Sequence, residues 1–235
     1  IKYLKEPVSI IKEILHDINI NIEKDKLTIL ALDPANVCMV NFKLLSPVFT
    51  EYEVEEPVKI GISLEHLNAI LKRCQEGDKL TMELDKNRII ITLDGYTKRI
   101  FTLPLLTIDE EKTKSPDLKY DVKIKMDNVK FREVIEDYSV ASDVVRFTLD
   151  KNKFEINSEG NLIKMDSEVI AEFEESDKKI SSRYSLEYLN KIIKAGNLTD
   201  SVLIKFANNY PLTLDYLLID KMLLEFILAP RVSED

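Results

Sequence analysis

The segment SLEYLNKIIK at residues 185–194 carries apolar side chains three and four residues apart, which is the spacing of one face of an α-helix. A second segment, SLEHLNAILK at residues 63–72, matches it at seven of ten positions. In each segment a serine, Ser185 or Ser63, precedes the first apolar residue and is a favourable N-cap. The pattern therefore predicts two short amphipathic helices of the same design.

The order of the neighbouring segments also repeats. Helical periodicity at residues 8–18 and 128–140 precedes the two copies. Alternating apolar and polar residues predict strands at 26–33, 36–44, 78–84, 88–95 and 98–106, and again at 153–160, 161–170, 200–207, 212–219 and 223–230. Each half is thus a helix, a group of strands, a second helix and more strands. The chain is therefore predicted to be a duplicated α+β domain whose antiparallel sheets carry helices on one face.

A polar stretch separates the two halves. Residues 107–119, TIDEEKTKSPDLK, contain Pro116 and show no convincing period. Such a composition is typical of a surface linker. We therefore expect an N-terminal domain at residues 1–106 and a C-terminal domain at residues 120–235.

Composition and charge narrow the class of protein. The 235 residues are 45% hydrophobic and 32% charged, as in soluble globular proteins, and no apolar run approaches the roughly 20 residues that would span a bilayer. The first residues lack the apolar core of a signal peptide, and no basic localisation run is present, so we expect a cytoplasmic protein of a cell without a nucleus. The net charge of −9 should repel nucleic acid unless the charges are sorted onto different faces.

No catalytic or metal-binding motif is recognisable. His16 and His66 are expected on the polar sides of helices, and Cys38 and Cys74 lie among apolar residues, where buried thiols are expected. The five glycines form no phosphate-binding loop. The carboxylates occur in runs that favour a solvated surface: Glu53, Glu55 and Glu56, then Asp109, Glu110 and Glu111, then Glu172, Glu174 and Glu175. We expect no catalytic residue, metal or cofactor, and a binding or scaffolding role. A hydrolase built from scattered carboxylates is the alternative from a different class.

Several motifs, taken in order, resemble a known family. They are LDPANV (32–37), SLEHLNAILKR (63–73), SLEYLNKIIKA (185–195), YPLTLDY (210–216) and ILAPRVSED (227–235). Over nearly its whole length the chain resembles the DNA sliding clamps of the proliferating cell nuclear antigen type, with details closest to archaeal members. The resemblance implies two domains of the DNA-clamp fold, with antiparallel sheets outside and helices lining the inner face of a ring. A damage-checkpoint clamp of the same fold is an alternative.

The resemblance also implies a mechanism and partners. Three subunits, identical or different, close into a ring around double-stranded DNA without reading its sequence, and the ring tethers DNA polymerase and confers processivity. Flap endonuclease, DNA ligase and the clamp loader are further expected partners, and no membrane is involved. Contacts to phosphates carry no sequence information, which is compatible with sliding.

The resemblance assigns roles to residues of this chain. The expected subunit interface comprises Arg99, Ile100, Phe101, Thr102 and Leu103 on one edge, and Val169, Ile170, Ala171, Glu172 and Phe173 on the other. The expected partner-peptide groove comprises Leu32, Pro211, Ile227, Ala229 and Pro230 beside the linker. The expected DNA-facing cations are Lys12, Lys72, Arg73, Lys191 and Lys194. In the linker, Thr113 and Ser115 stand where the family commonly has apolar residues.

The expected helix faces toward DNA are only weakly charged. Their charges leave one net negative charge, counted over Lys12, Glu13, His16 and Asp17, Glu65, Lys72 and Arg73, Arg132, Glu133, Glu136 and Asp137, and Glu187, Lys191 and Lys194. Glu136 stands where the family often has a basic residue. Other subunits could supply more of the positive lining, so the sequence favours a heteromeric ring.

Overall fold

Both halves of the chain contribute strands to one antiparallel sheet. The structure, a computed structural model, describes residues 1–108, 114–159, 163–173 and 179–231. The nine-stranded sheet has the strand order β12-β8-β14-β15-β16-β3-β2-β1-β4. Its strands are β1 (Asp17–Ile22), β2 (Lys26–Leu32), β3 (Cys38–Leu45), β4 (Val58–Ser63), β8 (Val122–Asp127), β12 (Glu172–Phe173), β14 (Ser201–Phe206), β15 (Leu212–Leu218) and β16 (Met222–Leu228). The halves join where β16 pairs with β3, with Leu224 opposite Phe42.

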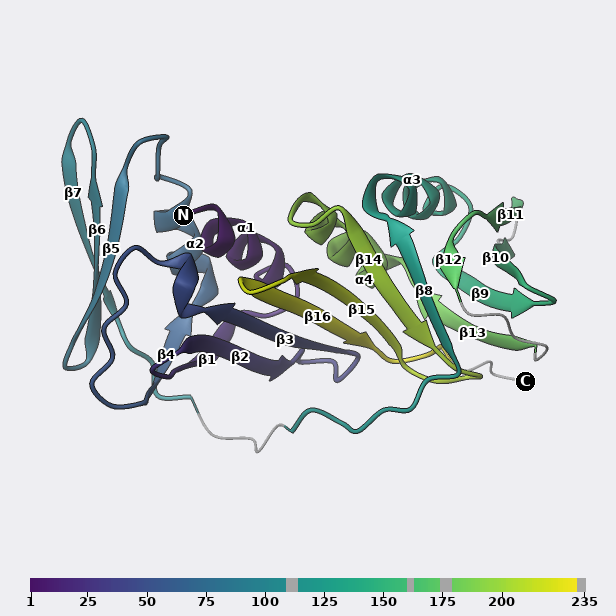
Figure 1. The fold of residues 1–235 in the computed structure, drawn as a ribbon, viewed down its shortest axis with the longest axis horizontal. Helices are drawn as coiled ribbons and strands as arrows, with labels where there is room; N and C mark the ends of the chain where they lie inside the picture. Colours follow the sequence, from purple (N-terminus) through teal and green to yellow (C-terminus); the bar gives the residue numbers. More distant parts are fainter. Residues whose placement is uncertain (109–113, 160–162, 174–178, 232–235) are drawn as a thin grey trace.

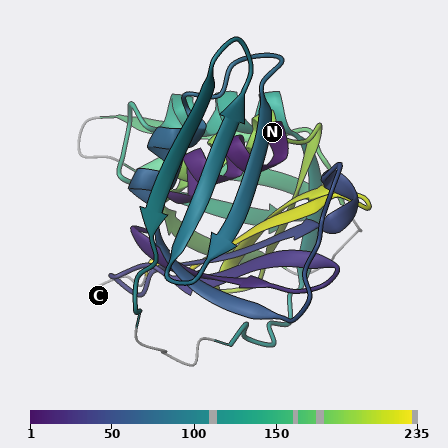
Figure 2. The ribbon, with the colours of Figure 1, turned by 90° about the vertical axis from the view of Figure 1, so that its left-hand side faces the viewer.

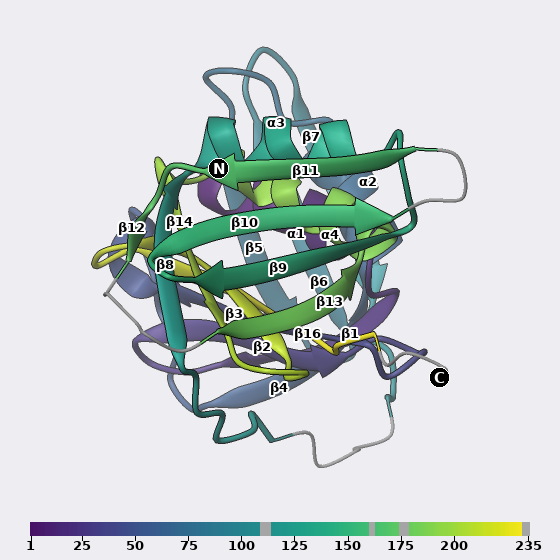
Figure 3. The same ribbon diagram turned by 90° about the vertical axis from the view of Figure 1, so that its right-hand side faces the viewer.

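Two smaller antiparallel sheets lie at opposite ends of the molecule (Figure 1). One is formed by β5 (Lys79–Asp85), β6 (Arg88–Asp94) and β7 (Lys98–Pro104), and Figure 2 shows it in front. The other has the order β11-β10-β9-β13 and is in front in Figure 3; its strands are β9 (Val144–Asp150), β10 (Lys153–Glu159), β11 (Lys164–Val169) and β13 (Ile180–Ser185). Within the described residues, β7 and β11 each pair on one side only, so each is a free edge.

Four helices cover one face of the nine-stranded sheet (Figure 1). They are α1 (Lys2–Ile11), α2 (Leu64–Leu71), α3 (Asn128–Tyr138) and α4 (Leu186–Ile192), and the 3₁₀ helix η2 (Ile193–Asn197) continues α4. A short 3₁₀ helix, η1 (Ser46–Val48), follows β3. The alternation of β3 explains the layering, because Cys38, Val40 and Phe42 are buried beneath the helices whereas Met39 and Asn41 point to the other face. We call that other face the outer face.

The two copies of the repeated segment form α2 and α4 as predicted, but the helix predicted at residues 8–18 is misplaced and overlaps the observed helix only at residues 8–11. The observed helix is Lys2–Ile11, and Asp17–Ile22 is strand β1. Pro7 lies inside α1 and is buried, so packing of this helix outweighs the backbone hydrogen bond that a proline removes. Strands β1, β4, β8, β9 and β13 were also absent from the sequence-based prediction.

Candidate functional site

The expected DNA-facing cations are distributed along the helical layer, but two of them are paired within the chain. Lys191 Nζ donates a 2.8 Å hydrogen bond to Glu187 one turn earlier, and it also lies 5.1 Å from the centre of the Tyr188 ring. Lys194 Nζ lies 2.5 Å from Glu13 Oε2, so this pair links η2 to the end of α1. The hydrogen bond and the charge of Lys191 lower the pKa of Glu187. Both lysines therefore have much of their charge compensated locally.

The other three cations form no ion pair with any residue that the structure describes. Lys72 and Arg73 follow α2 directly and are exposed, and Lys12 follows α1 and is half-buried. Lysines at the ends of helices are also favourable for the helix itself, because the C-terminus carries partial negative charge. Lys130 on α3 is a further exposed, unpaired lysine that the sequence analysis missed, because the expected polar face of that helix began at Arg132.

On the outer face, cross-strand pairing brings the expected groove residues together. Leu32 lies opposite Met39, Met39 opposite Ile227, and Ile227 opposite Thr213, so the four form one row across β2, β3, β16 and β15. Directly opposed residues of antiparallel strands share a face. We call these four residues the outer row.

The next row of the same face holds two of the three remaining expected groove residues, Ala229 and Pro211. Ala229 N–H donates a 2.8 Å hydrogen bond to the carbonyl of Val37, and Pro211 precedes β15 next to it. Pro230 follows and is half-buried. Val37 and Met39 also belong to these rows but were not among the expected groove residues. The alternation of residues 36–44 could have identified them, because it places both on the face of the strand away from the buried Cys38.

A buried carboxylate shapes the turn at the end of the outer row. Asp33 is 4% exposed and accepts hydrogen bonds from the N–H groups of Ala35 (3.2 Å), Val37 (2.7 Å) and Cys38 (2.6 Å). It also accepts a 2.6 Å hydrogen bond from Tyr188 OH, which comes from α4 in the other half of the chain. Burial acts to raise the pKa of Asp33, but the hydrogen bonds from Cys38, Tyr188, Val37 and Ala35 outweigh it and the pKa is lowered.

Two carboxylates share one lysine in the middle of the outer face. Lys205 Nζ lies 2.7 Å from Asp215 and 3.9 Å from Glu225, and all three side chains are about one-sixth exposed, at 16%, 15% and 16%. Asn41 donates a 2.9 Å hydrogen bond to Glu225. Burial, together with the charge of Glu225, raises the pKa of Asp215 to about 6 against the opposing effect of Lys205.

Asp215 should therefore give the stability of the protein a pH dependence. An acid whose pKa is raised on folding keeps its proton in the native state where the unfolded chain has lost it, so its contribution to stability falls as the pH rises from about 4 to about 6. We expect the stability of wild type relative to Asp215→Asn to fall by about 2 kcal/mol across this window. Urea unfolding at several pH values measures it, with the exposed Asp94→Asn as control. A constant difference between wild type and Asp215→Asn would contradict the prediction.

Both ends of the linker are attached to the body of the protein. At its start, Leu106 N–H donates a 2.9 Å hydrogen bond to the carbonyl of Gly61 in β4, where a Cβ would lie only 2.2 Å from the Leu106 oxygen. At its end, the Tyr120 hydroxyl is hydrogen-bonded to Thr213 of the outer row. Burial raises the pKa of Tyr120 to about 12. Of the linker positions that depart from the family pattern, Ser115 is exposed and Thr113 lies outside the described residues.

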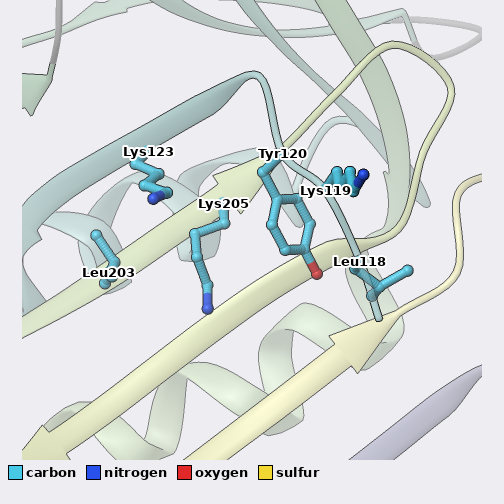
Figure 4. Close-up of a pocket in the computed structure, with 6 residues that line it drawn as sticks. All are labelled: Leu118, Lys119, Tyr120, Lys123, Leu203 and Lys205. Carbon is cyan, nitrogen blue, oxygen red and sulfur yellow. The ribbon is translucent and has the colours of Figure 1, made fainter. Parts of the chain in front are cut away.

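An open surface pocket of about 480 Å³, which we call the cavity, lies beside Tyr120 (Figure 4). Its lining consists of Leu118, Lys119, Tyr120, Lys123, Leu203 and Lys205. The Lys205 Nζ is 5.6 Å from the centre of the Tyr120 ring. The Tyr120 and Tyr210 rings also pack edge to face, with 6.0 Å between ring centres. The cavity therefore combines aromatic and aliphatic walls with three ammonium groups.

The edge strand β7 presents unpaired backbone groups. Leu105 N–H donates to the Asn87 carbonyl and continues the pairing of β7 with β6. Because inward and outward N–H groups alternate along an antiparallel edge, those of Ile100 and Thr102 point away from β6. Pro104, which has no N–H, lies in the same outward phase.

Side chains at the two edges differ in character. On β7, Ile100 and Thr102 are exposed, Phe101 is half-buried and Leu103 is buried. Arg99 is turned inward to Asp78, and its Nη2 lies 2.5 Å from the carboxylate.

The second expected edge, residues 168–173, is not one strand. Val169 ends β11 and is buried, Ile170 is 89% exposed, Ala171 is half-buried, and Glu172 and Phe173 form β12 beside β8.

The described residues offer no candidate metal site and no candidate membrane-spanning helix. None of their histidine, cysteine, aspartate and glutamate side chains group in threes in a way that could hold a metal ion. Cys38 and Cys74 are free and buried, as expected. No helix among them is long and apolar enough to cross a membrane. Of the acidic runs, Asp109, Glu110, Glu111, Glu174 and Glu175 lie outside the described residues.

Comparisons of sequence relate this chain to a family of known proteins, and a comparison of structure shows the same fold. The family described as "Proliferating cell nuclear antigen, N-terminal domain" matches residues 2–114, and "Proliferating cell nuclear antigen, C-terminal domain" matches residues 114–231. DNA polymerase sliding clamp 1 of Thermococcus kodakarensis is 33% identical over 217 residues, which cover 90% of this chain and 87% of that protein. The DNA polymerase sliding clamp of Nanoarchaeum equitans is 31% identical over 240 residues, covering 98% and 96%. The crystal structure of PCNA from Thermococcus kodakaraensis superposes with a TM-score of 0.90 at 23% identity, covering 98% of this chain and 96% of that one, and shows the same fold.

Proposed function

Because the chain belongs to the proliferating cell nuclear antigen family, we propose that it is a subunit of a ring-shaped sliding clamp that encircles duplex DNA and tethers DNA polymerase. The observation that carries this proposal is the placement of two free strand edges, β7 and β11, at opposite ends of a molecule whose helices share one face (Figure 1). Edges so placed can pair between subunits and close a ring, and closure removes the aggregation hazard of an open edge. The helical layer would then face the DNA.

We also propose domain boundaries and a setting for the protein. The clamp domains comprise residues 1–106 and 120–235, and residues 107–119 link them; residues 109–113 of this linker lie outside the described part of the chain. The clamp acts in the cytoplasm, at the nucleoid. It has no catalytic activity of its own, and its clients at the outer row include DNA polymerase, flap endonuclease and DNA ligase, with a clamp loader to open the ring. A robust turnover of DNA or nucleotides by the purified chain would instead support the hydrolase alternative.

The two edges of this chain have complementary features, which supports pairing between identical copies. The exposed residues of β7 include Lys98 and the 61%-exposed Ile100, whereas β11 exposes Asp166 and Glu168 and is followed by the 89%-exposed Ile170. A neighbouring edge would cover the two isoleucines. Glu168 is already paired with Lys153 at 2.8 Å and Asp166 with Lys164 at 3.7 Å, so the complementarity rests mainly on the apolar contact. The edges therefore support a ring of identical subunits, whereas the weakly charged helix faces support a ring of different subunits.

We expect light scattering of the purified chain to give three times the 27.2 kDa chain mass. Thr102→Pro should shift the protein toward 27.2 kDa, because it removes an outward N–H of β7, whereas Thr102→Val keeps that group and should stay assembled. A wild-type monomer would contradict the homomeric ring and support a ring completed by related chains.

The unpaired cations should matter more for DNA than the paired ones. We expect Lys72→Ala/Arg73→Ala to reduce clamp-dependent stimulation of DNA polymerase about tenfold and to flatten its salt dependence, because two free cations are lost. Lys191→Ala/Lys194→Ala should have a smaller effect, since Glu187 and Glu13 already compensate these lysines.

Primer extension at several salt concentrations, with a DNA polymerase that this clamp stimulates, measures both effects. Lys24→Ala/Lys43→Ala, two exposed lysines elsewhere on the chain, is the matched control for the same loss of charge. Unchanged stimulation in Lys72→Ala/Arg73→Ala would refute the assignment of these residues to the DNA-facing surface.

A further inference from the structure

The cavity beside Tyr120 carries positive charge that the chain itself does not compensate. Lys119 and Lys123 are both exposed, and neither forms an ion pair with any residue in the described part of the chain. Lys205, the third lysine of the lining, is compensated by Asp215 and Glu225. In a chain with a net charge of −9, two free ammonium groups around one cavity form a local anion-attracting site.

The cavity is a direct continuation of the outer row. Thr213 lies opposite Lys205, and Lys205 lies opposite Lys123, so the cross-strand line that starts at Leu32 ends in the cavity. Neighbouring strands are about 4.8 Å apart, which puts Ile227 of the outer row roughly 10 Å from Lys205. An extended peptide advances about 3.3 Å per residue. A peptide anchored on the outer row therefore reaches the cavity with its next three or four residues.

We propose that this cavity binds an acidic segment that flanks the apolar anchor of a client peptide. This inference rests on the proposed client-binding function of the outer row and adds a chemical preference to it. Carboxylates of the flank would accept hydrogen bonds from Lys119 and Lys123, while its aliphatic carbons pack on Tyr120 and Leu118 (Figure 4). Lys119 at the end of the linker and the adjacent Tyr120 form one wall, so the flank also contacts the linker.

A peptide suits the cavity better than nucleic acid does. Two of the six lining residues are leucines, and the aromatic ring of Tyr120 stands between Leu118 and Lys205 (Figure 4). The strand row beside it carries Asp215 and Glu225, which would repel a long run of phosphates. A short acidic segment meets the two free lysines and stops before these carboxylates.

The test compares two fluorescein-labelled peptides by anisotropy. Both carry three large apolar residues on one helical turn; one continues with four acidic residues and the other with four serine or asparagine residues. We expect the acidic flank to bind wild type about fivefold more tightly, because exposed ion pairs are individually weak. This advantage should fall below about twofold in Lys119→Gln/Lys123→Gln and should shrink as salt is raised from about 0.05 M to about 0.3 M. The control Lys24→Gln/Lys43→Gln loses the same charge and should keep it.

The outcomes separate this inference from the proposed function. Equal binding of the two peptides to wild type would overturn the acidic preference and leave the outer row as the client site. An advantage that persists in Lys119→Gln/Lys123→Gln would also overturn it. Displacement of the acidic peptide by a short DNA duplex at equal charge would assign the cavity to phosphates instead. If neither peptide binds wild type, the client-binding role of the outer row fails first, and this inference fails with it.

Discussion

Replacing Asp33 with alanine is expected to lower the free energy of unfolding by about 4 kcal/mol, because four donors lose their acceptor at once. The N–H groups of Val37 and Cys38 and the hydroxyl of Tyr188 all donate to this carboxylate at 2.6 to 2.7 Å. Hydrogen bonds to a charged group contribute about 1.5–3 kcal/mol each, but they are not additive when one residue makes them all. Urea unfolding measures the loss, and the exposed Asp94→Ala is the control.

The charge of Asp33 should be visible in the pH dependence of the same measurement. Its pKa is lowered in the folded protein, so its stabilisation is present above the ordinary value of 3.8 and is lost as the pH falls through the folded pKa. The isosteric Asp33→Asn variant should therefore be less stable than wild type at neutral pH, and the difference should shrink only as the pH falls below the ordinary value of 3.8. A gap that is independent of pH would show that the carboxylate acts through shape alone.

The Asp33→Ala substitution should also weaken the binding of client peptides to the outer row. The turn that Asp33 holds joins β2 to β3 and so positions Leu32 and Met39 of the outer row. Tyr188 reaches this turn from α4, so the contact also ties the two halves of the chain together. We expect Tyr188→Phe, which keeps the ring but removes one donor, to cost only about 1–2 kcal/mol.

Replacing Arg99 with alanine is expected to cost about 3 kcal/mol of stability, since it leaves a buried carboxylate without its counter-ion. Asp78 has a side chain only 3% exposed, and Arg99 Nη2 lies 2.5 Å from it. Arg99 Nη1 also donates a 3.0 Å hydrogen bond to the carbonyl of Arg73, so the same side chain holds the segment that follows α2. The exposed Lys24→Ala, which lies outside the β7 edge, should change stability by less than about 0.5 kcal/mol.

The double variant distinguishes this mechanism from a general effect of losing surface charge. If the cost comes from the uncompensated carboxylate, Asp78→Asn in the Arg99→Ala background should recover part of the stability. Purely additive losses would contradict the ion-pair explanation. Since Arg99 lies on the edge strand β7 but points inward, we expect its loss to affect folding more than subunit pairing.

The sequence by itself determined that the chain is a duplicated α+β domain with ten of its strands and three of its helices, because the signals for these elements are local. Apolar spacing suffices for α2 and α4, and its repetition implies a duplicated domain, as the structure and the family relationship confirm. Ser63 and Ser185 occupy the expected N-cap positions, but neither side chain makes a capping hydrogen bond. The five motifs between residues 32 and 235, taken together and in order, were sufficient to recognise the family. Pattern reasoning failed at α1, where burial of an internal proline in the assembled core outweighs the local helix-breaking signal.

Only the tertiary structure decided which charges are free and which side chains meet. Lys194 and Glu13 are 181 residues apart in sequence, and Tyr188 and Asp33 are 155 apart. Neither pairing has a local signal, because both depend on how the helical layer packs across the joint between β3 and β16. The same holds for the row from Leu32 to Lys123, which exists only through the register of six strands. Spacing along the chain identifies helices and strands, but contacts between them follow from their packing. This packing decides that Lys194 is paired with Glu13, whereas Lys72 and Arg73 form no ion pair with any described residue.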